Sequence, residues 1–176
     1  MMARDMDPQA LSLAAAFPDA ARVGDLLRRR SMRIAVAESC TGGLLGAALT
    51  AVPGSSDYVL GGVIAYANSV KTELLGVPEE LLRTYGAVSE QCAAAMAEGV
   101  RPLTGAEVGV SITGVAGPGS EGSSKPPGLI YVAAAVADMP TRVVQLDGDH
   151  GREANRALSV QAALLLVADL VAGEAS

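Results

Sequence analysis

The sequence predicts an α/β layered domain built on a mixed β-sheet, and three observations carry this prediction. The chain has 176 residues, close to the size of one domain, and half of them are apolar. Short apolar segments typical of strands alternate with longer Ala- and Leu-rich segments typical of helices. The last two strand-like segments are joined only by Asp138-Met139-Pro140, which predicts a hairpin and therefore an antiparallel pair.

No repeat, linker or low-complexity tract divides the chain. We therefore expect residues 20–176 to form one domain, preceded by an N-terminal extension or helix over residues 1–19. The stretch from about Gln9 to Arg30 has a helical pattern. A break is expected near Pro18, because proline lacks the backbone donor that a helix interior needs.

The next elements follow from local composition. Met32 to Ala37 is short, apolar and bounded by polar residues, which indicates a buried strand. A helix is predicted for Thr41 to Ala51, and the turn residues of Pro53-Gly54-Ser55-Ser56 end it. Tyr58 to Ala67 is strand-like, and its two adjacent glycines indicate a bulge or a close backbone approach. Asn68 to Leu75 is expected to form a short helix.

The second half continues this alternation. Pro78 suits the first turn of a short helix that ends at Tyr85. The Ser89 hydroxyl is a good N-cap for an Ala-rich helix that runs to about Leu103. Three strands and a final helix complete the domain, and they are predicted at Glu107 to Ile112, Leu129 to Ala137, Thr141 to Leu146 and Glu153 to about Val171.

The composition argues against several classes of protein. The net charge is −6, Trp is absent and there is one Phe, so the basic face and stacking aromatics of a general nucleic-acid binder are missing. No apolar run reaches about 18 residues, and the N-terminus lacks the order of a signal peptide. Two cysteines, Cys40 and Cys92, and the single His150 favour neither a disulfide framework nor a metal site. A cytoplasmic protein without metal, cofactor, membrane or nucleic-acid partner is expected.

Two predicted strands end in polar, glycine-bearing loops, ESCTGG at residues 38–43 and SITGVAGPGS at residues 111–120. Ligands of open α/β sheets bind beyond the carboxyl ends of strands. The backbone N–H groups of Thr41, Gly42 and Gly43 could donate to an oxyanion or a phosphate, since the first N–H groups of a helix lack intrahelical partners. By itself, this turn favours helix capping over catalysis.

The second loop offers hydroxyl groups. Ser111 and Thr113 are two residues apart, so both could face one side. The loop continues to Lys125, which we interpret as a solvated tip, and the loop could gate access to a site.

Ser39 could act as a nucleophile, and a serine nucleophile needs a base. His150 lies in the polar loop LDGDHGRE, where solvation is the simpler interpretation. Lys71 is the alternative, because burial favours the neutral amine, which can accept a proton. A solvated lysine is the commoner state. However, the chain has only two lysines, Lys71 and Lys125, and this scarcity favours a functional role.

Cys40 is a rival nucleophile, because a thiol at a helix start has a lowered pKa. The alternative is a small apolar residue in the core. Adjacent residues at a strand end point to opposite sides, so Ser39 and Cys40 are not both expected to face one site.

Three charged residues lie beside these loops. Glu38 could hold a base or orient a substrate, and a paired or solvated acid is an equal alternative. Arg152 and Arg156 are four apart near the start of the last helix, so they share one face and could bind a phosphate. Solvated arginines are the default, but the helix dipole disfavours positive charge at a helix start, which favours an anion nearby.

Four motifs in fixed order now identify a family: AESCTGG, PGSSDYVLGGVIAYANSVKTELLGV, YGAVSE, and SITGVAGPGS followed by KPPG. They resemble the C-terminal domain family of CinA, the competence/damage-inducible protein, whose stand-alone members are similar to nicotinamide-nucleotide amidases. The resemblance covers about residues 20 to 172. It implies a three-layer α/β/α sandwich with a mixed, mostly parallel sheet, often in homodimers.

The resemblance implies hydrolysis of the carboxamide of nicotinamide mononucleotide to nicotinate mononucleotide and ammonia, without a metal. A pyridine nucleotide would be the small-molecule partner. By position in the motifs, Ser39 corresponds to the nucleophile and Lys71 to the base. Tyr66 and Asn68 match the rest of the Y-x-N-x-x-K segment, and Thr113 matches the hydroxyl position of S-x-[ST]-G-x-A-G-P, followed by Gly114.

One departure concerns the Gly-Asp-Arg motif that usually precedes the last helix. Here the string is Gly148-Asp149-His150-Gly151-Arg152, and we expect Arg152 to supply the arginine from a shifted register. The predicted substrate-binding residues are Glu38, Thr41, Gly42, Gly43, Asn68, Ser111, Gly114, Arg152 and Arg156. Two alternatives stay open, a catalytically idle nucleotide- or partner-binding module of the same fold and a thiol enzyme that uses Cys40.

Overall fold

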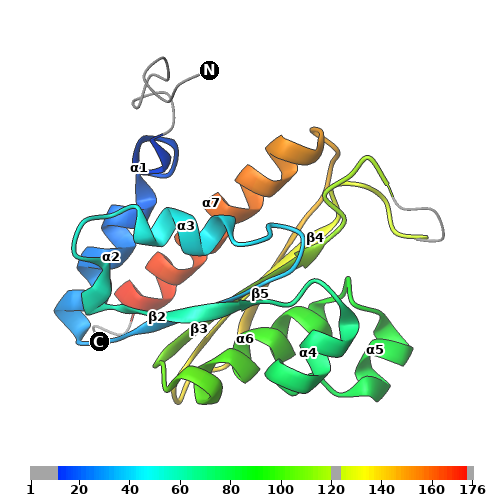
Figure 1. Ribbon diagram of the computed structural model, residues 1–176, viewed down its shortest axis with the longest axis horizontal. Helices are drawn as coiled ribbons and strands as arrows, with labels where there is room; N and C mark the ends of the chain where they lie inside the picture. Colours follow the sequence, from blue (N-terminus) through cyan, green and yellow to red (C-terminus); the bar gives the residue numbers. More distant parts are fainter. Residues whose placement is uncertain (1–11, 120–123, 174–176) are drawn as a thin grey trace, which may run out of the picture.

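A computed structural model describes residues 12–119 and 124–173 of the chain. Seven α-helices, one short 3-10 helix and five strands make up this described part (Figure 1). In chain order they are α1 (Leu13–Ala16), α2 (Asp19–Arg30), β1 (Ile34–Glu38), α3 (Leu44–Thr50), η3 (Ser55–Asp57), β2 (Val59–Ile64), α4 (Asn68–Leu75), α5 (Glu79–Tyr85), α6 (Glu90–Thr104), β3 (Val108–Gly114), β4 (Ile130–Val136), β5 (Arg142–Leu146) and α7 (Arg152–Gly173).

The strands form one sheet in the order β2-β1-β3-β4-β5. β1 pairs in parallel with both β2 and β3, whereas β4 is antiparallel to β3 and to β5. Four strands therefore run in one direction and β4 runs against them. This confirms the mixed, mostly parallel sheet and the hairpin that the short connection at residues 138–140 predicted.

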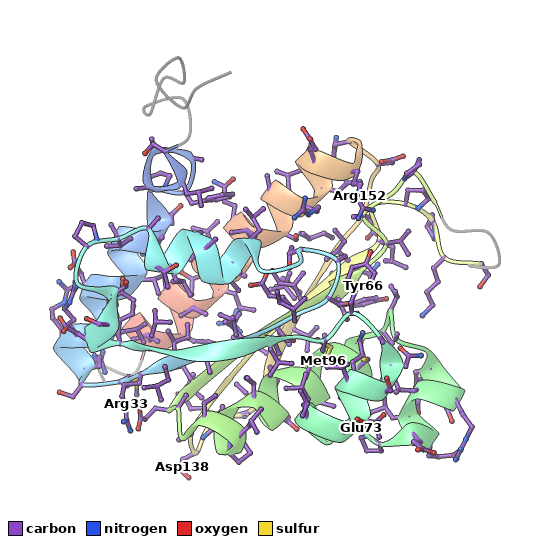
Figure 2. The ribbon with its side chains drawn as sticks, in the orientation of Figure 1. Arg33, Tyr66, Glu73, Met96, Asp138 and Arg152 are labelled. Atoms are coloured by element: carbon purple, nitrogen blue, oxygen red, sulfur yellow. The ribbon has the colours of Figure 1, made fainter. Side chains whose placement is uncertain are left out.

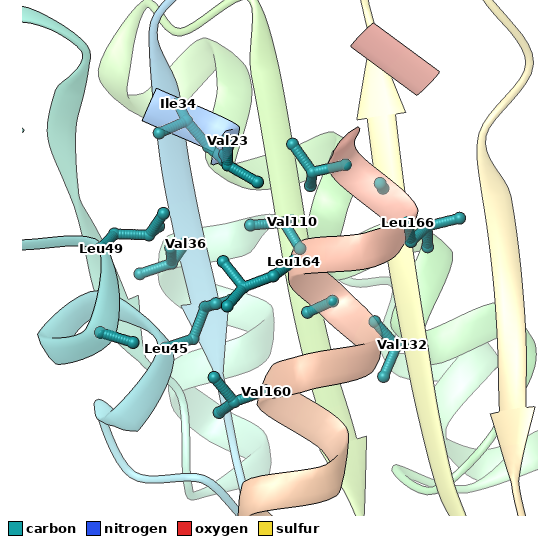
Figure 3. Close-up of a cluster of buried hydrophobic side chains, with 14 of the residues drawn as sticks. Val23, Ile34, Val36, Leu45, Leu49, Val110, Val132, Val160, Leu164 and Leu166 are labelled. Atoms are coloured by element: carbon teal, nitrogen blue, oxygen red, sulfur yellow. The ribbon is translucent and has the colours of Figure 1, made fainter. Parts of the chain in front are cut away.

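The helices cover both faces of the sheet, so the predicted three-layer sandwich is confirmed (Figure 1). On one face α2, α3 and α7 pack against branched side chains of the strands, including Val36, Val110 and Val132 (Figure 3). On the other face, where α6 lies, the strand residues are small. A Cβ atom added to Gly109 would lie only 2.1 Å from the carbonyl oxygen of Ala97, so the α6 backbone rests directly on the sheet.

The predicted elements are present with shifts of a few residues at their ends, and the break near Pro18 separates α1 from α2. The predicted helical stretch at residues 9–11 lies outside the described residues. The largest informative shift concerns α3, which begins at Leu44 instead of Thr41. Gly42 and Gly43 have φ angles of 59° and 98°, which no right-handed helix contains, so they form a turn.

The last helix, α7, is the one described helix whose length and composition would allow it to cross a membrane. Its apolar side packs on α2 and on the sheet instead, where Val160, Leu164 and Val171 are buried (Figure 3). This is the pattern of a central core helix.

Candidate active site

The polar turns after β1 and β3 lie side by side because these two strands are parallel neighbours, with Glu38 paired to Ile112. A cavity of about 290 Å³ opens there, beyond the carboxyl ends of the strands. The residues that line it are Ser39 and Cys40 in the turn after β1, Tyr66, Lys71, Ala87, Val88, Thr113 to Gly117, Gly119 and Arg152. A larger hollow of about 370 Å³ lies between α4 and α5, but among the residues that line it there is no nucleophile beside a base.

Ser39 and Lys71 meet inside this cavity. The Lys71 Nζ atom lies 3.2 Å from the Ser39 Oγ atom, and the Lys71 side chain is only 1 % exposed. The sheet creates this approach. Ala65 continues the pairing of β2 with β1 through its N–H bond to the Glu38 carbonyl, and α4 begins three residues later. Ser39 therefore follows the end of β1, and Lys71 lies on α4, which follows the end of the neighbouring strand β2.

The surroundings of Lys71 favour its uncharged form. Burial lowers the pKa of the Lys71 ammonium below its ordinary value, because the charged form loses its hydration. Lys71 makes no ion pair with any residue that the structure describes. Nearby lie the carbonyl oxygens of Ala65 at 2.6 Å and Tyr66 at 3.2 Å.

These two carbonyl oxygens also orient the amine. Carbonyl oxygens only accept hydrogen bonds, so they bind the two hydrogens of a neutral Lys71 amine. The third direction, toward Ser39, is then left to the nitrogen lone pair. A neutral Lys71 held in this way can accept the proton of the Ser39 hydroxyl, which is the requirement for a general base.

Glu38 has a different task from the one considered for it in the sequence. Its side chain is fully buried and accepts hydrogen bonds from the backbone N–H groups of Gly43 at 3.1 Å, Leu45 at 3.0 Å and Gly46 at 2.8 Å. It is thus an internal anion at the start of α3 and does not line the cavity. The Gly43 N–H is consequently unavailable to a ligand. The Gly42 N–H is also engaged, because it donates to the Ser39 carbonyl oxygen at 3.1 Å.

We expect that Glu38→Gln lowers the free energy of unfolding by roughly 1–3 kcal/mol, because the amide group of glutamine turns a donor toward at least one buried N–H. Urea denaturation followed by circular dichroism measures this change. Glu73→Gln on α4 is the matched control, since Glu73 is an exposed glutamate. Equal stability of wild type and Glu38→Gln would contradict the role as internal anion.

The two hydroxyls of the second loop do point to one side, as their spacing predicts, but only one reaches the cavity. Thr113 lines the cavity with Gly114, and its Oγ1 atom donates to the Ala87 carbonyl oxygen at 2.7 Å. The Ser111 hydroxyl is buried under α6 and donates to the Ala93 carbonyl oxygen at 2.6 Å. The structure therefore does not bring Ser111 to the cavity.

Tyr66 and Asn68 are separated by the structure. Tyr66 stands at the rim of the cavity with its side chain 62 % exposed, and its backbone carbonyl oxygen holds Lys71. Its phenol makes no hydrogen bond with Ser39 or Lys71. Asn68 is exposed at the first turn of α4 and faces the hollow between α4 and α5. Of this motif, Tyr66 and Lys71 belong to the cavity.

The two arginines of the last helix, Arg152 and Arg156, also have different positions, and only Arg152 lines the cavity. Arg152 lines the cavity and donates to the Gly117 carbonyl oxygen at 2.9 Å. Figure 2 shows it at the same end of the molecule as Tyr66. Arg156 is half-buried and donates to the Thr41 carbonyl oxygen at 2.7 Å, so it supports the turn that carries Ser39. His150 lines a separate groove beside β5 and α7 and has no part in the cavity.

Cys40 packs into the hydrophobic core below α3 and α7. Burial raises the pKa of its thiol to about 11, because the thiolate would lose its hydration. The Ser39 hydroxyl thus approaches Lys71 while the Cys40 side chain packs with the core, and Cys40 also contributes to the cavity wall. Among the described residues, no three His, Cys, Asp or Glu side chains gather in a way that could hold a metal ion.

Sequence reasoning missed Ala87 and Val88 and assigned Arg156 the wrong partner. Ala87 and Val88 belong to the quoted motif YGAVSE, yet their side chains carry no chemistry, and only their place in the cavity wall reveals them. Arg156 was considered as a ligand of phosphate, whereas its partner is a backbone carbonyl that no sequence pattern marks.

Comparison with known proteins agrees with this fold and identifies a family. The family model of the CinA C-terminal domain matches residues 18–171. A putative competence-damage inducible protein of Desulforudis audaxviator is 59 % identical over 115 residues, which are 65 % of this chain and 28 % of that protein. A CinA-like protein of a Synechococcus species is 54 % identical over 142 residues, 80 % of this chain and 34 % of that protein. The chain thus spans about a third of the length of these relatives.

Solved structures share the fold over nearly their whole length. The competence/damage inducible protein CihA of Agrobacterium tumefaciens superposes with a TM-score of 0.83 at 38 % identity, covering 87 % of this chain and 93 % of that one. The competence damage-inducible protein A of Klebsiella pneumoniae gives a TM-score of 0.85 at 30 % identity, covering 90 % and 98 %. Since the family model spans almost all described residues and the motifs lie at one cavity, the chain belongs to the CinA C-terminal domain family.

Proposed function

We propose that this chain hydrolyses the carboxamide of nicotinamide mononucleotide to nicotinate mononucleotide and ammonia. The observation that carries the proposal is the buried Lys71 amine, 3.2 Å from the Ser39 hydroxyl and held by two backbone carbonyl oxygens. This pair supplies a nucleophile and a base, and no carboxylate lines the described part of the cavity to replace either. The motifs of the family supply the substrate class.

In the first half of the reaction, the neutral Lys71 amine takes the proton of the Ser39 hydroxyl while the Oγ atom bonds to the carboxamide carbon. The tetrahedral intermediate then collapses, and the resulting Lys71 ammonium returns its proton to the leaving nitrogen, which departs as ammonia. An ester between Ser39 and the nicotinate group remains. In the second half, Lys71 deprotonates a water molecule that attacks this ester, and the acid and the free Ser39 hydroxyl are released.

The oxyanion of the intermediate needs backbone donors. The Gly43 N–H donates to the Glu38 carboxylate, and the Gly42 N–H donates to the Ser39 carbonyl oxygen, so neither is available. The N–H group of Cys40, which lines the cavity, donates to no carbonyl in the described part of the chain, and we assign the oxyanion to it. Thr41, which the sequence also suggested as a donor, is fully buried and does not line the cavity. A single such donor typically contributes about 3 kcal/mol to lowering the barrier.

The charges at the cavity suit a pyridine mononucleotide. A pyridinium ring is positively charged, which makes its carboxamide more electrophilic and also favours a neutral Lys71 beside it. Besides Lys71, Arg152 is the one basic residue in the described cavity wall. Its guanidinium can bind the phosphate of the substrate. The amide would then lie at Ser39 and the phosphate toward α7.

An ammonia assay over a panel of amides tests the proposal. We expect turnover of nicotinamide mononucleotide, much slower turnover of nicotinamide riboside, which lacks the phosphate, and none of asparagine. A chelator is expected to leave the rate unchanged. The absence of ammonia from every amide would favour the alternative of an idle nucleotide-binding module. The homodimer, the cytoplasmic location and the lack of a nucleic-acid partner stay predictions.

A further inference from the structure

The connection between α5 and α6 forms one wall of the cavity through Ala87 and Val88. It has an unusual pattern of hydrogen bonds, because four consecutive backbone carbonyl oxygens each accept from a side chain. Ser89 donates to the Gly86 oxygen at 2.8 Å, and Thr113 donates to the Ala87 oxygen at 2.7 Å. The oxygens of the two outer residues, Tyr85 and Val88, both accept from Lys125. The backbone of each residue from Tyr85 to Val88 is thus fixed by a side chain through its carbonyl oxygen.

Lys125 comes from the long loop between β3 and β4, which lies at the same end of the molecule as α5 (Figure 1). The base of that loop is fixed by backbone bonds that link Val115 with Leu129 and Gly128. Its first residues, up to Gly119, form the neighbouring wall of the cavity. Lys125 therefore ties the two walls together, and the structure replaces the interpretation of this lysine as a solvated tip.

We propose that Lys125 is a positioning residue, which clamps the Tyr85–Val88 segment against the β3–β4 loop and so sets the width of the substrate cavity. An ammonium group suits this task, because it carries three donors and charge-assisted hydrogen bonds to carbonyl oxygens are strong. The Ser39–Lys71 pair takes its contacts from β1 and from residues 65–71. Loss of the clamp therefore impairs substrate binding and spares the chemical step.

The first test needs no substrate. In Lys125→Met, hydrogen exchange of the Gly86 amide, which donates to Leu82, and of the Cys92 amide, which donates to Ser89, should rise about ten-fold as the segment opens more often. Lys125→Arg can bridge both carbonyls and should keep exchange near that of the wild type. The control is Arg83→Met, which removes an equal charge from α5, where the ion-pair partners of Arg83 among the described residues are Glu79 and Glu80.

The second test rests on the proposed function. With nicotinamide mononucleotide, Lys125→Met should raise KM about ten-fold and change kcat less than three-fold, which is the signature of lost binding rather than lost catalysis. Lys125→Arg should restore KM, and Arg83→Met should leave both constants unchanged. Exchange at the wild-type rate in Lys125→Met overturns the clamp, and so does a fall in kcat at constant KM. If the wild-type chain releases no ammonia, the proposed function fails while the exchange experiment still decides on the clamp.

Discussion

Replacing Ser39 by alanine is expected to lower ammonia release from nicotinamide mononucleotide by at least about 10⁴-fold, because the hydroxyl that forms the covalent intermediate is gone. The substitution removes one oxygen atom from a cavity wall and leaves the hydrogen bonds of the Ser39 backbone in place. The fold should therefore be retained. Steady-state ammonia assays at saturating substrate, with circular dichroism to verify folding, measure the effect.

Cys40→Ala is the matched comparison, since it changes the adjacent residue by the loss of one sulfur atom. The Cys40 thiol lies in the core and its pKa is raised to about 11, so it stays protonated and cannot replace the hydroxyl. Activity within a few-fold of the wild type is expected. The opposite pattern, with Cys40→Ala inactive and Ser39→Ala active, would identify a thiol enzyme and refute the mechanism.

The second large effect concerns Lys71. Replacing it by methionine keeps the unbranched apolar stem of the buried side chain and removes the base, so we expect kcat to fall by about 10³-fold, within the range that general bases contribute. Lys71→Arg should be equally inactive, because a guanidinium does not lose its proton in proteins. An active arginine variant would show that the residue acts through its charge.

The pH profile of the wild type gives an independent measure of the same base. Burial lowers the pKa of Lys71 below 10.5, so the neutral form that accepts a proton is present above this lowered pKa and is lost as the pH falls through it. The value of kcat/KM should therefore rise with pH along one titration step and level off below pH 10.5. A value of kcat/KM that rises nowhere below pH 10.5 would contradict the assignment.

Sequence reasoning reached the sheet and the pairing of Ser39 with Lys71 because both depend on strong local signals. Short apolar strands and their Gly- or Pro-marked ends placed β1 and β3, and the scarcity of lysine singled out Lys71. The different surroundings of the Ser39 hydroxyl, beside Lys71, and of the Cys40 thiol, in the core, were expected from the alternation along a strand. These features depend on residue type and spacing, which a single sequence displays directly.

What escaped prediction depends on backbone groups. The Glu38 side chain is buried because it accepts hydrogen bonds from three backbone N–H groups at the start of α3. The left-handed turn at Gly42 and Gly43 that precedes this helix is not evident from residue types alone. In the same way, Ser111, Arg156 and Lys125 each bind carbonyl oxygens of segments distant in the chain. A carbonyl oxygen belongs to every residue, so sequence patterns do not identify which one is the partner.

The internal anion at Glu38 has a consequence for how a substrate enters. Glycine turns at helix starts usually attract phosphate, but here the positive end of α3 is already balanced by the chain itself. Attraction for an incoming anion therefore comes from the far wall, where Arg152 lies. The two ends of the cavity therefore differ in charge. A molecule with an anionic end and an amide end would bind with its anion at Arg152 and its amide at Ser39, because the reversed orientation would leave the anion without a counterion.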